Sequence, residues 1–176
     1  MTDWIKASNP TASITTEAEA IGAARASALA IFLGVIWGGI GVALLMTGGG
    51  SAEIEAAVAQ ASADTPEMAG MGGAMVQIAL WTAVGFCALQ LVIGLVQWAK
   101  PNIVIPIIFA ILVAFGLASG ALGMMMAGQE GMPDSAAAPT WQTYVGLVIL
   151  VIQLVLHIAG IRGARALDKI RMAAAQ

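Results

Sequence analysis

The sequence predicts an all-α integral membrane protein: a bundle of four transmembrane helices, arranged as two helical hairpins, with both termini in the cytoplasm. Of its 176 residues, 60% are hydrophobic and only 10% are charged, whereas soluble domains are about 25% charged. Four stretches are also long and apolar enough to cross a bilayer, which takes about 20 residues. This composition excludes a water-soluble domain, a disordered chain and a nucleic-acid-binding module.

The chain is interpreted as a single membrane domain, residues 1–176, in which apolar spans alternate with polar segments. None of the four spans contains Asp, Glu, Lys or Arg. The predicted order is a cytoplasmic N-terminal segment 1–15, a span at about 27–46, an outer loop 47–74, a span at about 75–98, a span at about 103–126, an outer loop 127–142, a span at about 143–161 and a cytoplasmic helical tail 162–176.

The basic residues predict the orientation of these spans. All seven fall on one side of the predicted topology: Lys6, Arg25, Lys100, Arg162, Arg165, Lys169 and Arg171. The two loops on the other side carry acidic residues and neither Lys nor Arg. Because Lys and Arg concentrate in cytoplasmic segments, we expect a multi-pass protein of the bacterial cytoplasmic (inner) membrane with both termini inside.

Two helices are expected to extend beyond the membrane. Thr16 and Glu19 fit a capping box, in which a hydroxyl and a carboxylate three residues later bind free N–H groups, so the first helix is predicted to run from about Thr16 to Met46. The alanine-rich tail 163–175 is predicted to continue the fourth helix.

These two extensions are rich in alanine and are expected to pack closely. The interpretation places Glu17 or Glu19 near Arg165 or Lys169. Trp4 is expected to anchor the N-terminal segment at the headgroup level, which Trp favours.

Small and polar residues recur at helical spacing within the spans. Small residues let membrane helices approach closely, and amide side chains bond across the gap. These positions are the predicted contact stripes: Cys87, Gln90, Gly94 and Gln97 in the second span, Gly116 and Gly120 in the third, and Gly146, Gln153 and His157 in the fourth.

Two further sets of residues each carry two interpretations. Met68, Met71 and Met75 share one side of a helix, and thioethers select Cu(I), but methionine also fills irregular packing gaps. The basic residues of the tail would bind anionic lipid headgroups, or only mark the cytoplasmic side: Arg162, Arg165, Lys169 and Arg171.

The function expected from these features is that of a non-catalytic accessory or structural subunit of a membrane complex. Cys87 and His157, the only residues of their types, lie in different spans, so no enzyme activity or cofactor is expected. The expected partners are the lipid bilayer and other membrane subunits or further copies of the chain.

Two alternatives remain open. One is a small self-assembling transporter or channel for a neutral solute or Cu(I), with its lumen lined by Gln77, Gln90, Gln97, Gln153 and His157. The other is a pigment- or haem-binding subunit that uses His157 as an axial ligand. The competing interpretation of His157 is a histidine that bonds within the bundle.

Overall fold

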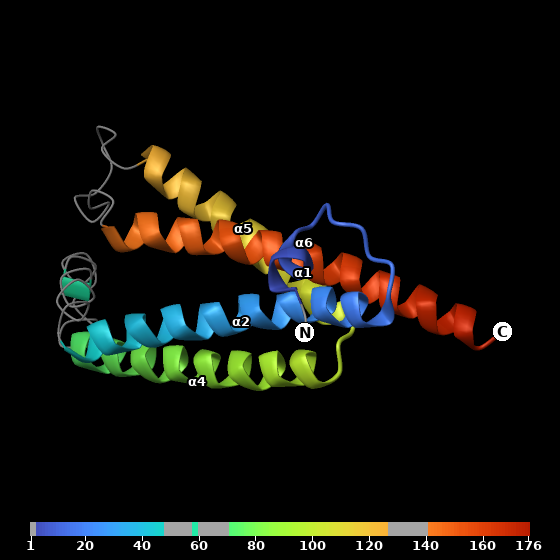
Figure 1. Ribbon diagram of the computed structural model, residues 1–176. Helices are drawn as coiled ribbons and strands as arrows, with labels where there is room; N and C mark the ends of the chain where they lie inside the picture. Colours follow the sequence, from blue (N-terminus) through green and yellow to red (C-terminus); the bar gives the residue numbers. More distant parts are fainter. Residues whose placement is uncertain (1–2, 48–57, 60–70, 127–140) are drawn as a thin grey trace. The chain divides into compact units, whose positions relative to one another are not determined.

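The computed structural model describes residues 3–47, 58–59, 71–126 and 141–176, and the regular structure in these ranges is α-helical throughout (Figure 1). The helices are α1 (Trp4–Ser8), α2 (Glu17–Met46), α4 (Gly72–Ala99), α5 (Val104–Met126) and α6 (Trp141–Ala174). Four of them, α2, α4, α5 and α6, are long and apolar enough to span a membrane. An all-helical chain with four such helices is therefore confirmed.

The helix ends follow local sequence signals. At the start of α2, the Thr16 hydroxyl accepts a hydrogen bond from the N–H of Glu19, and the Glu19 carboxylate accepts one from the N–H of Thr16, both at 3.2 Å. This reciprocal pair is the predicted capping box. At the other end of the chain, α6 continues without a break to Ala174, as predicted for the tail.

The chain forms two compact units. The first unit comprises residues 1–34 and 91–176, and the second comprises residues 35–90. Within the first unit, α2 is the central helix, with these residues buried: Ala20, Gly22, Ala23, Ala24, Ala26, Ser27, Ala28, Ala30 and Ile31. Successive residues of an α-helix turn by about 100°, so these positions cover every side of the helix. Residues 20–31 are therefore enclosed all round.

Glycines on the neighbouring helices permit this enclosure. A methyl group on Gly163 of α6 would lie 2.2 Å from the backbone nitrogen of Ala24, and one on Gly160 would lie 2.6 Å from the Cβ of Ser27. On α4, a methyl group on Gly94 would lie 2.6 Å from the ring of Phe32. Only residues without a Cβ fit at these positions, as expected for close helix contacts in membranes.

Helices α5 and α6 run side by side within the first unit (Figure 1). Here too α5 presents glycines, because a methyl group on Gly120 would lie 2.8 Å from the side chain of Leu147 and one on Gly116 would lie 3.6 Å from that of Leu150. In the second unit, Gly38 of α2 faces Cys87 of α4, whose sulfur would lie 2.8 Å from an added methyl group. The small-residue positions of the contact stripes thus lie where large side chains of other helices pack.

Candidate functional site

Four polar side chains are buried among the described residues, and all of them lie in the first unit: Ser27 on α2, Gln97 on α4, and Gln153 and His157 on α6. Burying a polar group is costly unless it is hydrogen-bonded, so the partners of these groups indicate their role.

His157 bonds to the central helix. Its Nδ1 and the Oγ of Ser27 share a hydrogen bond of 2.8 Å, in which the ring tautomer decides the donor. The other ring nitrogen, Nε2, is buried and has no hydrogen-bond partner among the described residues. The side chain has no exposed surface, and the ring of Phe109 lies 5.6 Å away between centroids. A haem or chlorophyll macrocycle at Nε2 would have to displace packed side chains.

The two buried glutamines bond to the backbone of the same helix. Gln153 donates from Nε2 to the carbonyl of Ala30 at 2.9 Å, and Gln97 donates to the carbonyl of Ala24 at 3.3 Å. Gln97 also donates to the carbonyl of Asn102 at 3.1 Å and accepts from its N–H at 3.3 Å. These amides join α4 and α6 to α2, and Gln97 also holds the turn that leads to α5.

These contacts bear on the lumen interpretation. Three of the five proposed lumen groups, Gln97, Gln153 and His157, are buried and bond to α2. The other two, Gln77 and Gln90, lie in the second unit, where Gln77 is exposed and Gln90 is half-buried. The structure therefore brings the first three together around α2.

The remaining predicted positions do not form a metal site among the described residues. Met71 and Met75 are exposed at the start of α4, and Met68 lies outside the described residues, as do most of the two outer loops. In the described part of the chain, no group of three or more His, Cys, Asp or Glu side chains could hold a metal ion. Gly146 is half-buried on α6.

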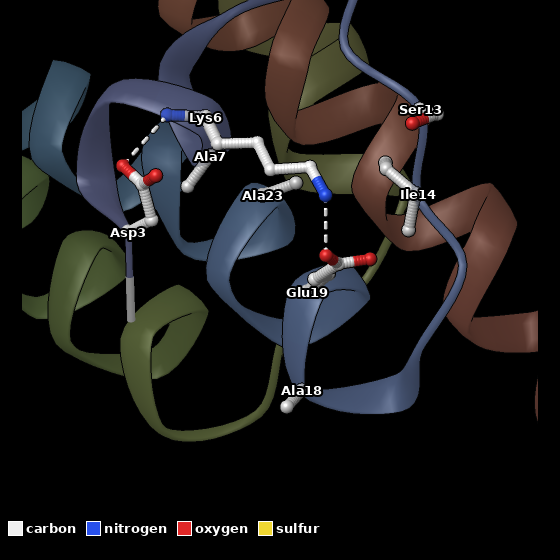
Figure 2. Close-up of a pocket in the computed structure, with 8 residues that line it drawn as sticks. All are labelled: Asp3, Lys6, Ala7, Ser13, Ile14, Ala18, Glu19 and Ala23. Atoms are coloured by element: carbon white, nitrogen blue, oxygen red, sulfur yellow. Dashed lines mark hydrogen bonds and ion pairs between the residues drawn. The ribbon is translucent and has the colours of Figure 1, made fainter. Parts of the chain in front are cut away.

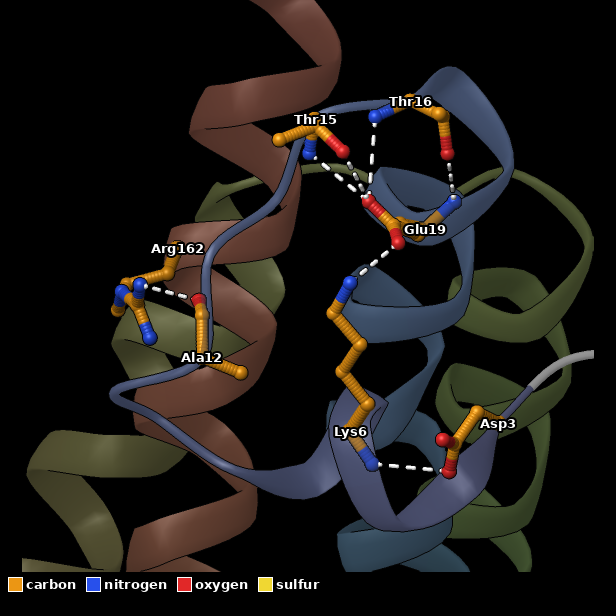
Figure 3. Close-up of polar contacts among 7 residues, drawn as sticks. All are labelled: Asp3, Lys6, Ala12, Thr15, Thr16, Glu19 and Arg162. Atoms are coloured by element: carbon orange, nitrogen blue, oxygen red, sulfur yellow. Dashed lines mark hydrogen bonds and ion pairs between the residues drawn. The ribbon is translucent and has the colours of Figure 1, made fainter.

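Two of the four basic tail residues bond to protein groups. Arg162 donates to the carbonyl of Ala12 at 2.9 Å (Figure 3), and Arg171 donates to the Glu17 carboxylate at 3.1 Å. The predicted partners of Glu17, Arg165 and Lys169, were therefore wrong. The helix extensions do pack closely as predicted, but Arg171 lies two residues beyond Lys169 and is the one that reaches Glu17.

The N-terminal segment forms a small cavity against the start of α2. It has a volume of about 320 Å³ and is lined by Asp3, Lys6, Ala7, Ser13, Ile14, Ala18, Glu19 and Ala23 (Figure 2). Its charged groups already have partners: Lys6 forms an ion pair with Glu19, and Asp3 accepts hydrogen bonds from the N–H groups of Ile5 and Lys6. The predicted interaction of Glu19 with Arg165 or Lys169 was thus also wrong.

Glu19 is the acidic residue that ties this segment down (Figure 3). The hydrogen bond from Lys6, followed by those from the N–H and hydroxyl of Thr15, lowers the pKa of Glu19 from 4.5 to about 2. A carboxyl group whose pKa is depressed by folding stabilises the folded form above its unfolded pKa and loses that contribution as the pH falls through the folded value. Attachment of residues 3–16 should therefore weaken between pH 4.5 and about 2.

We expect amide hydrogen exchange, measured by mass spectrometry, to show this loss of protection in residues 3–16 over that pH range. Glu19→Gln should lower protection at neutral pH and remove most of its pH dependence. Glu17→Gln removes only the exposed pair with Arg171 and serves as the control. Equal pH dependence in Glu19→Gln and the unmodified chain would contradict the assignment.

Sequence reasoning missed two contacts of this unit. Asn102 caps α5, because its Oδ1 accepts hydrogen bonds from the N–H groups of Val104 and Ile105, both at 3.0 Å; an Asn just before an apolar helix is a recognisable cap signal. The second is the contact of Arg25 with Trp98, for which the sequence carries no signal. Comparison of the chain with family models, with curated proteins and with solved structures gave no match.

Proposed function

We propose that the chain is a non-catalytic subunit of a membrane complex in the bacterial inner membrane, with both termini in the cytoplasm. The observation that carries the proposal is the use of the buried polar side chains: Gln97, Gln153 and His157 all bond to α2. Amide and imidazole groups in membrane helices serve either as sites or as links between helices. Here their bonds link helices, which favours a structural role.

The placement of charge supports the proposed orientation. All seven basic residues flank the helix ends on one side of the predicted topology, which is the usual cytoplasmic bias of Lys and Arg. On that side, Arg162 and Arg171 bond to residues of the N-terminal half of the chain. Both termini therefore belong to the same compact unit, as required if they lie on the same side of the membrane.

A second candidate function has one specific observation in its favour. Nε2 of His157 has no partner among the described residues, while Nδ1 is oriented by Ser27, and metal-binding histidines commonly have one ring nitrogen oriented in this way. Against it, the ring is fully enclosed and lies beside Phe109. Visible absorption of the purified protein tests this candidate: a Soret or chlorin band that disappears in His157→Gln would favour it.

The subunit proposal is tested by purifying the full chain from native membranes in mild detergent, with an affinity tag after Gln176. We expect other membrane proteins to co-purify in fixed stoichiometry and to be identified by mass spectrometry. An unrelated multi-pass protein with the same tag is the control for adventitious partners. The tag should resist protease in intact spheroplasts and be cleaved after lysis, as the proposed orientation requires.

Two outcomes would overturn the proposal. A solitary, monodisperse monomer would contradict a subunit role. A stable assembly containing only copies of this chain would instead favour the self-assembling transporter or channel.

A further inference from the structure

Arg25 and Trp98 form a cation–aromatic contact at one end of the apolar helices. Arg25 lies on α2 just before the apolar span, and Trp98 lies at the end of α4. The guanidinium carbon is 5.2 Å from the centroid of the Trp98 ring, and Nε donates a hydrogen bond to the Trp98 carbonyl at 3.1 Å. Two contacts therefore fix the orientation of a planar cation whose side chain is otherwise flexible.

Aromatic residues place this contact at the headgroup level. The ring of Trp4 stacks on that of Trp98, with centroids 5.7 Å apart and 18° between the ring planes. Tryptophan is enriched where hydrocarbon meets the headgroups. Ile5, next to Trp4, is 85% exposed, which suits a side chain at the edge of the hydrocarbon.

The guanidinium has unused donors. Arginine carries five N–H donors, and one of them, at Nε, is used by Trp98. In the described part of the chain, the terminal nitrogens of Arg25 have no hydrogen-bond partner, and no carboxylate forms an ion pair with them. The two acidic side chains of the N-terminal segment and the start of α2 that line its cavity, Asp3 and Glu19, are engaged by α1 and by Lys6.

The ligand that fits such a group is a phosphate at the membrane surface. A guanidinium fork binds phosphate oxygens in pairs, and Lys100, two residues after Trp98 and exposed, adds a second positive charge. We propose that Arg25, oriented by Trp98, binds the phosphate of an anionic phospholipid in the leaflet next to the chain termini. Two positive charges favour a headgroup without an ammonium group, such as phosphatidylglycerol, over phosphatidylcholine.

The test compares lipids on the purified full chain. Phosphatidylglycerol, phosphatidylcholine or inorganic phosphate is added to the protein in detergent, and bound lipid is counted by native mass spectrometry while the thermal midpoint is recorded. We expect phosphatidylglycerol to be retained preferentially and to raise the midpoint, and inorganic phosphate at millimolar concentration to leave it unchanged. Equal retention of the two lipids, or equal stabilisation by phosphate alone, would overturn the proposal.

Variants locate the site. Arg25→Gln should weaken phosphatidylglycerol binding by about fivefold, the factor that corresponds to one basic residue at an anionic surface. Arg165→Gln removes an exposed basic residue of the tail and should leave the preference unchanged. Should Arg25→Gln fail to fold, Arg25→Lys keeps the charge without the planar fork and should still lower the preference. An unchanged preference in the Arg25 variant that folds would overturn the assignment.

Discussion

Replacement of Gly163 by alanine is expected to destabilise the protein by about 3 kcal/mol, at the upper end of the cost of overpacking. The added methyl group would lie 2.2 Å from the nitrogen of Ala24 and 2.5 Å from the carbonyl carbon of Ala23. Both are backbone atoms of the enclosed helix α2, so no side-chain rotation relieves the overlap. The helices must move apart, and the hydrogen bond between Ser27 and His157 lies next to this contact.

The free energy of unfolding in mixed micelles, from titration with a denaturing detergent, measures this effect. Gly123→Ala is the matched control, because a methyl group on Gly123 of α5 would meet nothing within 4 Å. There alanine should be neutral or stabilise by up to about 1 kcal/mol through its helix propensity. If both substitutions had the same effect, the close contact of α6 with α2 would be wrong.

The comparison of these two glycines shows which part of the fold sequence reasoning could reach. Helix position follows from apolar length and from caps, which are local: α2 ends at Met46 as predicted and begins one residue after Thr16. Whether a glycine meets another helix depends on its neighbours in space. On α4, Gly85 lies in the open and Gly94 is pressed against Phe32, although both belong to the same apolar run.

The candidate site was reached in part for the same reason. Polar residues in an apolar span are rare and costly, so Gln97, Gln153 and His157 could be singled out from their type alone. Their partners could not be, because two of them are main-chain carbonyls, of Ala24 and Ala30, and a carbonyl group is common to every residue.

Long-range ion pairs were predicted least well. Glu17 could in principle reach any basic residue of the tail, and the register of α2 against α6 decides which one it meets. That register is set by Gly160 and Gly163 against Ser27 and Ala24, and a helix of nearly uniform alanine gives no indication of it in the sequence.

The second large effect is expected at Gln97. Gln97→Leu should cost about 2 kcal/mol, because the amide makes hydrogen bonds to the carbonyl of Ala24 and to both the carbonyl and the N–H of Asn102. Leucine keeps the volume but leaves buried groups of the turn without partners, and such groups cost about 1–3 kcal/mol. Asn102 caps α5, so loss of Gln97 should also loosen the first turn of that helix.

Two measurements separate this effect from a general loss of polarity. Gln77→Leu makes the same substitution on the same helix at an exposed position and should leave the free energy of unfolding nearly unchanged. Hydrogen exchange in Gln97→Leu should rise at Asn102, Val104 and Ile105, whose N–H groups bond to Gln97 or to the cap. A uniform rise along α5, or equal destabilisation by the two substitutions, would mean that Gln97 contributes only its packing. The predicted pattern, by contrast, makes one buried amide the link between the central helix and the turn that begins α5.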